Sequence, residues 1–526
     1  MMYQPLRHIL RLLAIARTLQ RHGALEPLEP LLEGFGLGPA ILRFARVFAP
    51  PRRLGAERGR PGQHLAAALS ELGPAFIKLG QMLSTRADLL GEDIAADLSL
   101  LQDRLEPFAG ADARRTIEAE LGSPIEQLFV AFDDNPVSAA SIAQVHYAKR
   151  MPDDDAQGGQ VAVKVLRPGI ERAFARDIEL MRWLALLVER AQPRLRRLRL
   201  GKVVETFSEM VRVEMDLRLE AAAASELGGN FAGDPTYRVP SIDWRRTARR
   251  VMTQERLTGI PMDDRDALIE AGHDIASVLD KAAAIFFKQV FRDGYFHADQ
   301  HPGNMFVDAA GNIGAVDFGI MGRLDRKTRY YLADMLLAFI ERDYRRVADV
   351  HFAAGYVPAY QSPDLFAQAC RSIGEPIFGR PLNEISFARL LGQLFQISET
   401  FDMEVQPQLL LLQKNMLMAE GVSRRLNPDL NIWTLAQPLI ETWMKENRGP
   451  EARLRDAATD LLQTVERLPA LLSNMDRVMA RWAESGTWLG ADAATEFSRR
   501  QDAATRWLLV LTTAVALLAL VVLASL

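Results

Sequence analysis

Three short motifs in a fixed order restrict the fold of this 526-residue chain more than any other feature. The first is VAVKV at 161–165, whose apolar alternation predicts a β-strand with Lys164 on one face. In the second, Asn304 follows Asp299 by five positions, and in the third Asp317 follows an apolar run and precedes Phe-Gly. An amine, carboxylates and an amide are groups that bind phosphate and Mg²⁺. A fold that uses them together must bring distant segments to one site.

This order and spacing are typical of a kinase active site. There, the strand lysine contacts the α- and β-phosphates and the catalytic-loop aspartate faces the nucleophile, while the asparagine and the DFG aspartate bind Mg²⁺. We therefore predict catalytic roles for Lys164 and Asp299, and metal binding for Asn304 and Asp317.

A metal hydrolase is an alternative for the segment HADQHPGN at 297–304, because it contains His297 and His301. Such a site needs a third ligand nearby and an open coordination position. Pro302 and Gly303 end the local structure instead. The kinase interpretation is therefore preferred.

The pattern of apolar residues predicts an α+β chain with a protein-kinase-like two-lobed fold. Residues 63–133 are expected to be helical throughout, 136–166 to form strands, and 325–500 to be mostly helical. The predicted parts are an N-terminal amphipathic helix and linker (1–62), a helical extension (63–133), a strand-rich lobe (134–260), a helical lobe (261–500) and a transmembrane anchor (507–526).

The last 20 residues, 507–526, contain no charged side chain. At about 1.5 Å per residue such a helix spans roughly 30 Å, the thickness of a bilayer's hydrocarbon core. Arg499, Arg500 and Arg506 precede it, and Trp507 lies where an interfacial aromatic belongs. We expect a single C-terminal transmembrane anchor that leaves the rest of the chain on the cytoplasmic face of the inner membrane, although a buried core helix is the alternative.

Two further segments have two interpretations each. Residues 5–22 form a basic amphipathic pattern that suits either an anionic membrane surface or docking on the protein core. The basic run from Arg194 to Lys202 suits either lipid head groups or a solvated face. The net charge of -4 gives no argument for nucleic-acid binding.

The chain departs from ordinary protein kinases in three places. No glycine-rich loop precedes Lys164, and the alanine-rich segment 139–144 takes its position. Ala298 replaces the arginine that would bind a phosphorylated activation loop. A helical pattern from Arg326 follows the DFG motif almost at once, which leaves little room for the segment that docks peptides. Phosphoryl chemistry is therefore favoured over protein phosphorylation.

With these motifs the chain resembles the UbiB family of atypical kinases, which support ubiquinone biosynthesis. The resemblance covers about residues 70–340 and the C-terminal anchor, and it implies binding of ATP or ADP with Mg²⁺, membrane-stimulated ATPase activity, and a K-x-G-Q extension folded over the peptide site. It implies that the K-x-G-Q motif (Lys78, Gly80 and Gln81) approaches the site and pairs with the E-x-D motif (Glu214 and Asp216). It also assigns nucleotide binding to the segment Ala139, Ala140, Ser141, Ile142, Ala143, Gln144 and Val145.

Two assignments depend on this resemblance and on spacing. The carboxylate partner of Lys164 is predicted to be Glu220, with Glu179 as the alternative because it is closer in sequence. The hinge that contacts adenine is placed at Glu255, where the preceding Gln254 is more polar than the residue usual there.

The sequence thus predicts a membrane-anchored kinase or ATPase that hydrolyses ATP or phosphorylates a small lipid-like molecule, and the resemblance implies that it does so for ubiquinone biosynthesis. The expected partners are membrane lipids and either quinone-biosynthesis enzymes or lipophilic quinone precursors, with a homodimer left open. The alternatives are a pseudokinase scaffold that uses nucleotide as a switch, and a protein kinase.

Overall fold

The computed structural model describes residues 3–24, 60–84, 105–152, 159–191, 200–377, 406–428 and 432–448, with single residues or short pieces at 94–101 and 393–403. The chain divides into two units, Met1–Trp443 and Met444–Leu526, and the site described below belongs to the first. Within the described part no helix is long and apolar enough to cross a bilayer. The predicted anchor at 507–526 and most of the basic run lie outside it.

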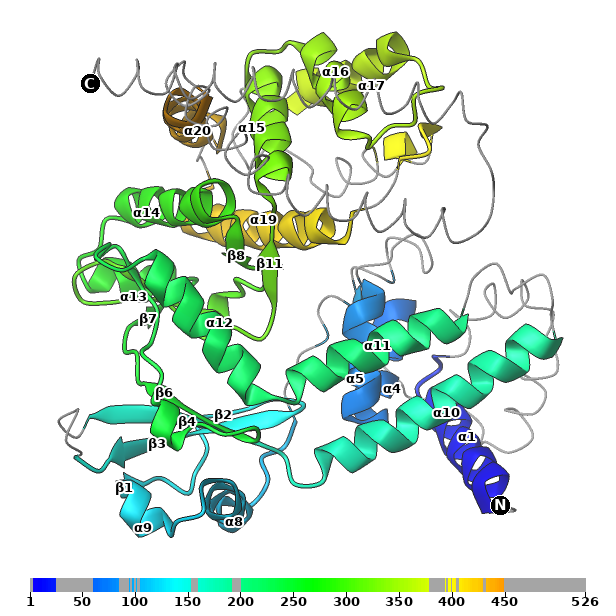
Figure 1. The fold of residues 1–526 in the computed structure, drawn as a ribbon, viewed down its shortest axis with the longest axis vertical. Helices are drawn as coiled ribbons and strands as arrows, with labels where there is room; N and C mark the ends of the chain where they lie inside the picture. The colour runs from blue at the N-terminus through cyan, green and yellow to red at the C-terminus, as the bar shows by residue number, and fades with distance from the viewer. Residues whose placement is uncertain are drawn as a thin grey trace, which may run out of the picture. The chain divides into compact units, whose positions relative to one another are not determined.

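An antiparallel sheet of five strands carries the predicted lysine (Figure 1). Its strands are β1 (Phe129–Phe132), β2 (Ser138–Ala139), β3 (Ala143–Arg150), β4 (Gln160–Leu166) and β6 (Val251–Glu255), in the order β1-β3-β4-β6 with β2 beside β3. The valines of β4 pack on helix α8 (Gly110–Leu121), next to α9 (Ile125–Leu128). The opposite face of β4 is therefore the one that faces the site.

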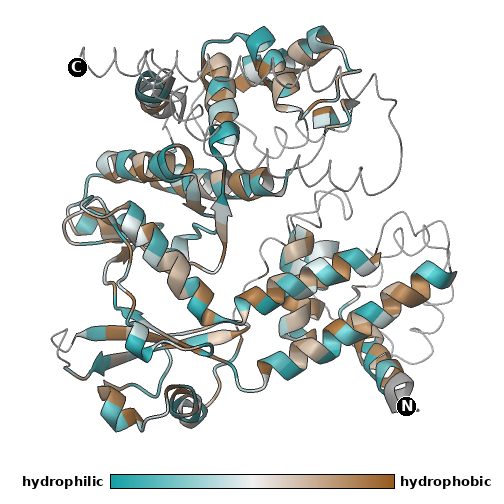
Figure 2. Ribbon diagram, viewed as in Figure 1, coloured by the Kyte–Doolittle hydropathy of each residue, from teal (hydrophilic) through white to brown (hydrophobic). Residues whose placement is uncertain are grey.

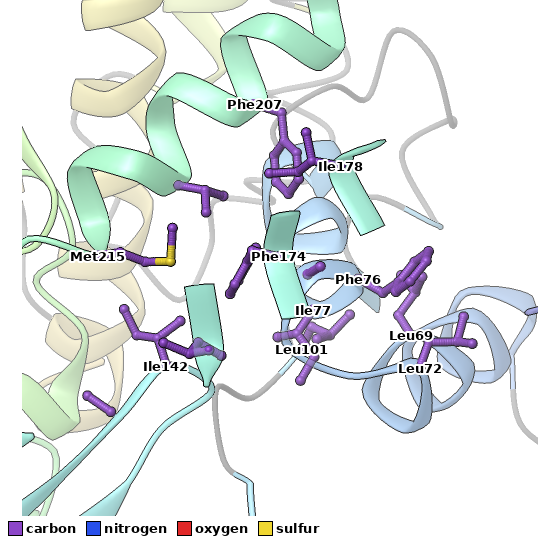
Figure 3. Close-up of a cluster of buried hydrophobic side chains, with 14 of the residues drawn as sticks. Leu69, Leu72, Phe76, Ile77, Leu101, Ile142, Phe174, Ile178, Phe207 and Met215 are labelled. Atoms are coloured by element: carbon purple, nitrogen blue, oxygen red, sulfur yellow. The ribbon is translucent and has the colours of Figure 1, made fainter. Parts of the chain in front are cut away.

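A second core joins the helical extension to the start of β3. It is formed by α4 (Pro61–Leu72), α5 (Pro74–Ser84), α10 (Ile170–Ala191) and α11 (Leu200–Glu214). Figure 3 shows Phe76, Ile77 and Phe174 in this core together with Ile142 from the alanine-rich loop. Hydrophilic and hydrophobic residues alternate along α10 and α11 (Figure 2), as expected for helices with one buried face.

The second lobe holds the catalytic loop between a two-stranded and a four-stranded sheet. Strands β5 (Tyr237–Arg238), β10 (Ile313–Ala315), β9 (Met305–Val307) and β7 (Ile260–Pro261) form one sheet, and β8 (Tyr295–His297) pairs with β11 (Met321–Arg323). The helices of this part are α12 (Leu217–Asn230), α13 (Arg265–Glu270), α14 (Ile275–Phe287), α15 (Arg326–Ile340), α16 (Tyr344–Ala354), α17 (Pro363–Ile377), α19 (Pro407–Leu426) and α20 (Ile432–Arg448). Of these, α14 contacts β10 and α19 contacts β11.

Within the described residues most expected elements form, and one expectation was wrong; the expected helices at 449–500 lie outside the described residues. Residues 129–132 were expected to be helical, but they form strand β1, because Phe129 belongs to the apolar cluster under the sheet and β1 pairs with β3. The helix after the DFG motif begins at Arg326 as predicted.

The N-terminal helix α1 (Tyr3–Arg21) packs on the protein, which is one of its two predicted modes. Arg11 donates to both carboxylate oxygens of Asp177 on α10 at 3.0 Å, and to the carbonyl of Leu72 on α4 at 3.1 Å. Ile15 and Leu19 pack against the core of the extension. Charge-assisted, bidentate hydrogen bonds of this kind fix the orientation of a helix.

Replacing Gly294 by Ala should destabilise the protein by about 2–4 kcal/mol. Gly294 has a φ of 64°, and an added Cβ would lie 2.4 Å from the Leu324 carbonyl oxygen. Gly272 is the matched control, because it has a φ of 82° but free space around a Cβ. Urea unfolding should show a smaller loss for Gly272→Ala, and equal losses would contradict the steric argument.

Candidate functional site

Lys164 lies at the centre of the candidate site, on the face of β4 opposite its buried valines. Its Nζ donates to both carboxylate oxygens of Glu220 on α12, at 2.7 and 2.9 Å. It also donates to Asp317 Oδ1 at 3.0 Å. Of the two partners left open by the sequence, Glu220 is the one that contacts Lys164, and the alternative Glu179 is wrong.

The charges of these three groups depend on one another. Burial opposes a charged Lys164, but the carboxylates of Asp317 and Glu220 outweigh it and raise the pKa of the lysine. The Lys164 ammonium lowers the pKa of Asp317 to about 2, whereas burial raises the pKa of Glu220. Asp317 is therefore ionised at neutral pH and carries the charge that a metal ligand needs.

The backbone of Asp317 is held in an unusual conformation. Its φ of 65° is in the left-handed region, which non-glycine residues adopt at a cost of roughly 1–3 kcal/mol. The neighbouring Phe318 is buried beside the ring of His297, and the Val316 N–H donates to the Asn304 carbonyl at 2.9 Å. These contacts fix the carboxylate of Asp317 next to the catalytic loop.

The catalytic loop is organised by its own side chains. His297 Nδ1 accepts from the Asp299 N–H at 3.1 Å, so its Nε2 carries the proton and donates to the Val316 carbonyl at 3.2 Å. Asn304 Nδ2 donates to the Asp299 carbonyl at 3.3 Å, so the amide oxygen of Asn304 is the atom that could face a metal. The loop thus orients Asp299 and Asn304 from one short segment.

Two residues that the sequence analysis did not identify come from α19. Lys414 Nζ donates to Asp299 Oδ1 at 2.9 Å. The fully buried Asn415 donates to the His297 carbonyl at 2.8 Å and accepts from the Gln300 N–H at 3.3 Å. A helix more than a hundred positions further along the chain therefore fixes the catalytic loop and places a cation beside its aspartate.

The alanine-rich segment forms the turn between β2 and β3. Arg167 donates to the Ala140 carbonyl at 2.9 Å, and the Ile142 side chain is anchored in the core of the extension (Figure 3). Val145 lies opposite Lys164 in the sheet register and shares its face. This loop is a packed turn, unlike a flexible glycine-rich loop.

Gln144 was predicted to bind nucleotide, and the structure gives it another role. Its side chain is fully buried, accepts from the Phe108 N–H at 3.0 Å and donates to the Phe108 carbonyl at 3.2 Å. It also contacts His146 at 2.8 Å. Gln144 therefore fixes the segment before α8 and is not available to a nucleotide.

Only part of the pairing that the resemblance implies between the K-x-G-Q and E-x-D motifs is present among the described residues. Lys78 on α5 forms an ion pair with Glu214 at the end of α11, and its charge contributes to the lowered pKa of Asp317. Asp216 does not take part as expected. Its side chain caps α12 by accepting from the Arg218 N–H, and it forms an ion pair with the Arg218 guanidinium at 2.7 Å, because Arg218 is only two residues away.

The other two K-x-G-Q residues have different roles. Gly80 lets α5 approach α4, because a Cβ on it would lie 2.8 Å from a methyl carbon of Leu69. For Gln81, the described residues show no side-chain hydrogen bond to Glu214 or Asp216. Its predicted pairing is thus absent from the part of the chain that the structure describes.

At the predicted hinge residue Glu255, the backbone N–H and the side chain already have partners within the protein. The Glu255 N–H donates to the Ser241 carbonyl at 2.8 Å, and its side chain pairs with Arg238. The backbone N–H of Glu255 is therefore not available to adenine.

The residues present fit Mg²⁺ better than a hydrolytic metal. Asp317 and Asn304 offer oxygen ligands, which suit Mg²⁺ when phosphate oxygens complete the coordination. His297 has both ring nitrogens bonded to backbone, and His301 Nδ1 accepts from the Gly303 N–H at 3.1 Å. No cluster of three or more His, Cys, Asp or Glu residues that could hold a metal occurs among the described residues.

Known domain families and proteins resemble this chain over most of its length. Residues 100–351 match the ABC1 atypical kinase-like domain, and residues 370–431 match the UbiB helical domain, which includes Lys414. A Marinobacter nauticus protein named Probable protein kinase UbiB is 43% identical over 461 residues, which cover 87% of this chain and 83% of that one. A protein of the same name from Xanthomonas axonopodis pv. citri is 42% identical over 485 residues, covering 91% and 85%. A solved structure of a Mycobacterium tuberculosis protein with erythromycin is 26% identical, covers 71% of this chain and 93% of that one, and has a TM-score of 0.49.

Proposed function

Because the chain belongs to the UbiB family of ABC1 atypical kinase-like proteins, we propose that it binds ATP or ADP with Mg²⁺ and hydrolyses ATP, or phosphorylates a small lipid-like molecule, for ubiquinone biosynthesis. The observation that carries this proposal is the ion cluster of Lys164 with Glu220 and Asp317. An ammonium in an apolar sheet is costly unless it is paired, and this one is held between the carboxylates of Glu220 and Asp317.

Each residue of the site has a part in this chemistry. Asp317 and Asn304 would hold Mg²⁺, which would neutralise charge on the phosphates. Lys164, oriented by Glu220, contacts the α- and β-phosphates. Asp299 accepts the proton of the attacking water or hydroxyl group. The oxygen of that water or hydroxyl group bonds to the γ-phosphorus, and the bond from the γ-phosphorus to the leaving oxygen of ADP breaks.

The acceptor is proposed to be small and lipophilic for two reasons. Only eight residues, 318–325, separate Asp317 from the start of α15 at Arg326, so a long peptide-docking segment has no room between them. The charge-free segment 507–526 is proposed to anchor the chain to the cytoplasmic face of the membrane, where quinone precursors partition.

The proposal is tested by ATP turnover of the full-length chain in detergent and in anionic liposomes, with and without a quinone-precursor-like phenol. We expect turnover that rises with lipid. Labelled ATP with membrane proteins forms a second arm, in which Asp299-dependent label on a protein would favour a protein kinase. Tight nucleotide binding without turnover in every condition would contradict catalysis and favour the scaffold.

A further inference from the structure

Gln254 lies on the same face of the sheet as Lys164. On β6 it is directly opposite Ala162 of β4, and Met252 is opposite Lys164. Residues two apart on a strand point to the same side, so Gln254, Met252, Ala162 and Lys164 share one face. The other face of β4 and β6 is filled by valines that pack on α8.

The side-chain carbonyl oxygen of Gln254 is buried and lacks a hydrogen-bond partner among the described residues. The residue is 7% exposed, and its Oε1 forms no hydrogen bond with any described residue. A buried carbonyl without a donor raises the free energy of the folded protein, and a ligand that supplies the donor recovers that energy. The unpaired oxygen therefore favours a ligand with a polar edge at this position.

The distance along the strand fits a nucleotide. Ala162 is two residues from Lys164, or roughly 7 Å along β4, which is similar to the length of the ribose between a base and its α-phosphate. Phosphates at Lys164 would place the base beside Ala162 and Gln254. The neighbouring Glu255 N–H is already bonded to Ser241, so it does not compete for the base.

Resting on the nucleotide site proposed above, we infer that the Gln254 amide binds the polar group at position 6 of a purine base. Its Oε1 accepts from a 6-amino group. After rotation of the amide, its Nε2 donates to a 6-oxo group instead. The site thus takes both adenine and hypoxanthine nucleotides, and it disfavours a purine that has only hydrogen at position 6.

The test is a cycle that removes the base substituent and the amide in turn. Binding of ADP, IDP and purine riboside diphosphate with Mg²⁺ is measured by equilibrium dialysis for the full-length chain and for Gln254→Met. In the unmodified chain we expect ADP and IDP to bind about tenfold more tightly than the 6-hydrogen nucleotide. In Gln254→Met the three affinities should agree within about twofold, because the substituent no longer has a partner.

The exposed Gln127 on α9 provides the matched control, and Gln127→Met should keep the tenfold difference. A difference that persists unchanged in Gln254→Met would overturn this inference while leaving the nucleotide site intact. If none of the three nucleotides binds even to the unmodified chain, the proposed function fails as well, so the two failures are distinguishable.

Discussion

Replacing Asp317 by Asn should lower ATP turnover by about 100-fold or more. The carboxylate of Asp317 is the charged ligand proposed for Mg²⁺ and also a partner of Lys164, at 3.0 Å. An amide has a similar shape but no charge, so both interactions weaken together. Turnover measured against Mg²⁺ concentration should show a higher Mg²⁺ requirement in the variant, because Asn304 is then the main protein ligand.

The substitution should not unfold the chain, which makes the result interpretable. Asn tolerates the left-handed conformation at least as well as Asp, so the φ of 65° adds no strain. Asp325→Asn is the matched control, because Asp325 caps α15 through the Thr328 N–H and Asn is an equally good cap. Turnover within about threefold of the unmodified chain in Asp317→Asn would contradict the assigned metal site.

Local patterns predicted the core of the site because each residue is placed by its immediate neighbours. Alternation within 161–165 turns Lys164 away from the buried valines, and the structure confirms that face. Likewise the apolar run before Asp317 forms β10 and ends just before it. Glu220 required the family resemblance as well, since 56 positions separate it from Lys164.

Long-range pairings were missed because no short pattern encodes them. Lys414 lies 115 positions after Asp299, and only the tertiary packing of α19 brings them together. One signal was present: the polar triplet 413–415 separates the apolar runs 409–412 and 416–419. Polar residues inside an apolar helix face need buried partners, and that rule would have marked Lys414 as a candidate.

Replacing Lys414 by Met should lower turnover about 10- to 100-fold and change nucleotide affinity by less than about threefold. Lys414 contacts Asp299, which is proposed to face the attacking group. The α- and β-phosphates are proposed to bind elsewhere, at the cluster around Lys164. Lys414 orients Asp299 and places positive charge where negative charge develops during transfer. The measurement is kcat together with the Kd for ATP.

A purely structural role for Lys414 would give a different pattern. In that case Lys414→Met would lower the thermal midpoint and weaken nucleotide binding along with turnover, as loss of the neighbouring Asn415 contacts would. A positioning role leaves the midpoint unchanged and is partly rescued by Lys414→Arg, which keeps the charge but not the geometry of the ammonium. Lys149→Met, at an exposed position near the end of β3, controls for the loss of a lysine charge and should have full activity. Because Lys414 belongs to α19 in the UbiB helical domain, rescue by arginine would make that domain part of the catalytic machinery.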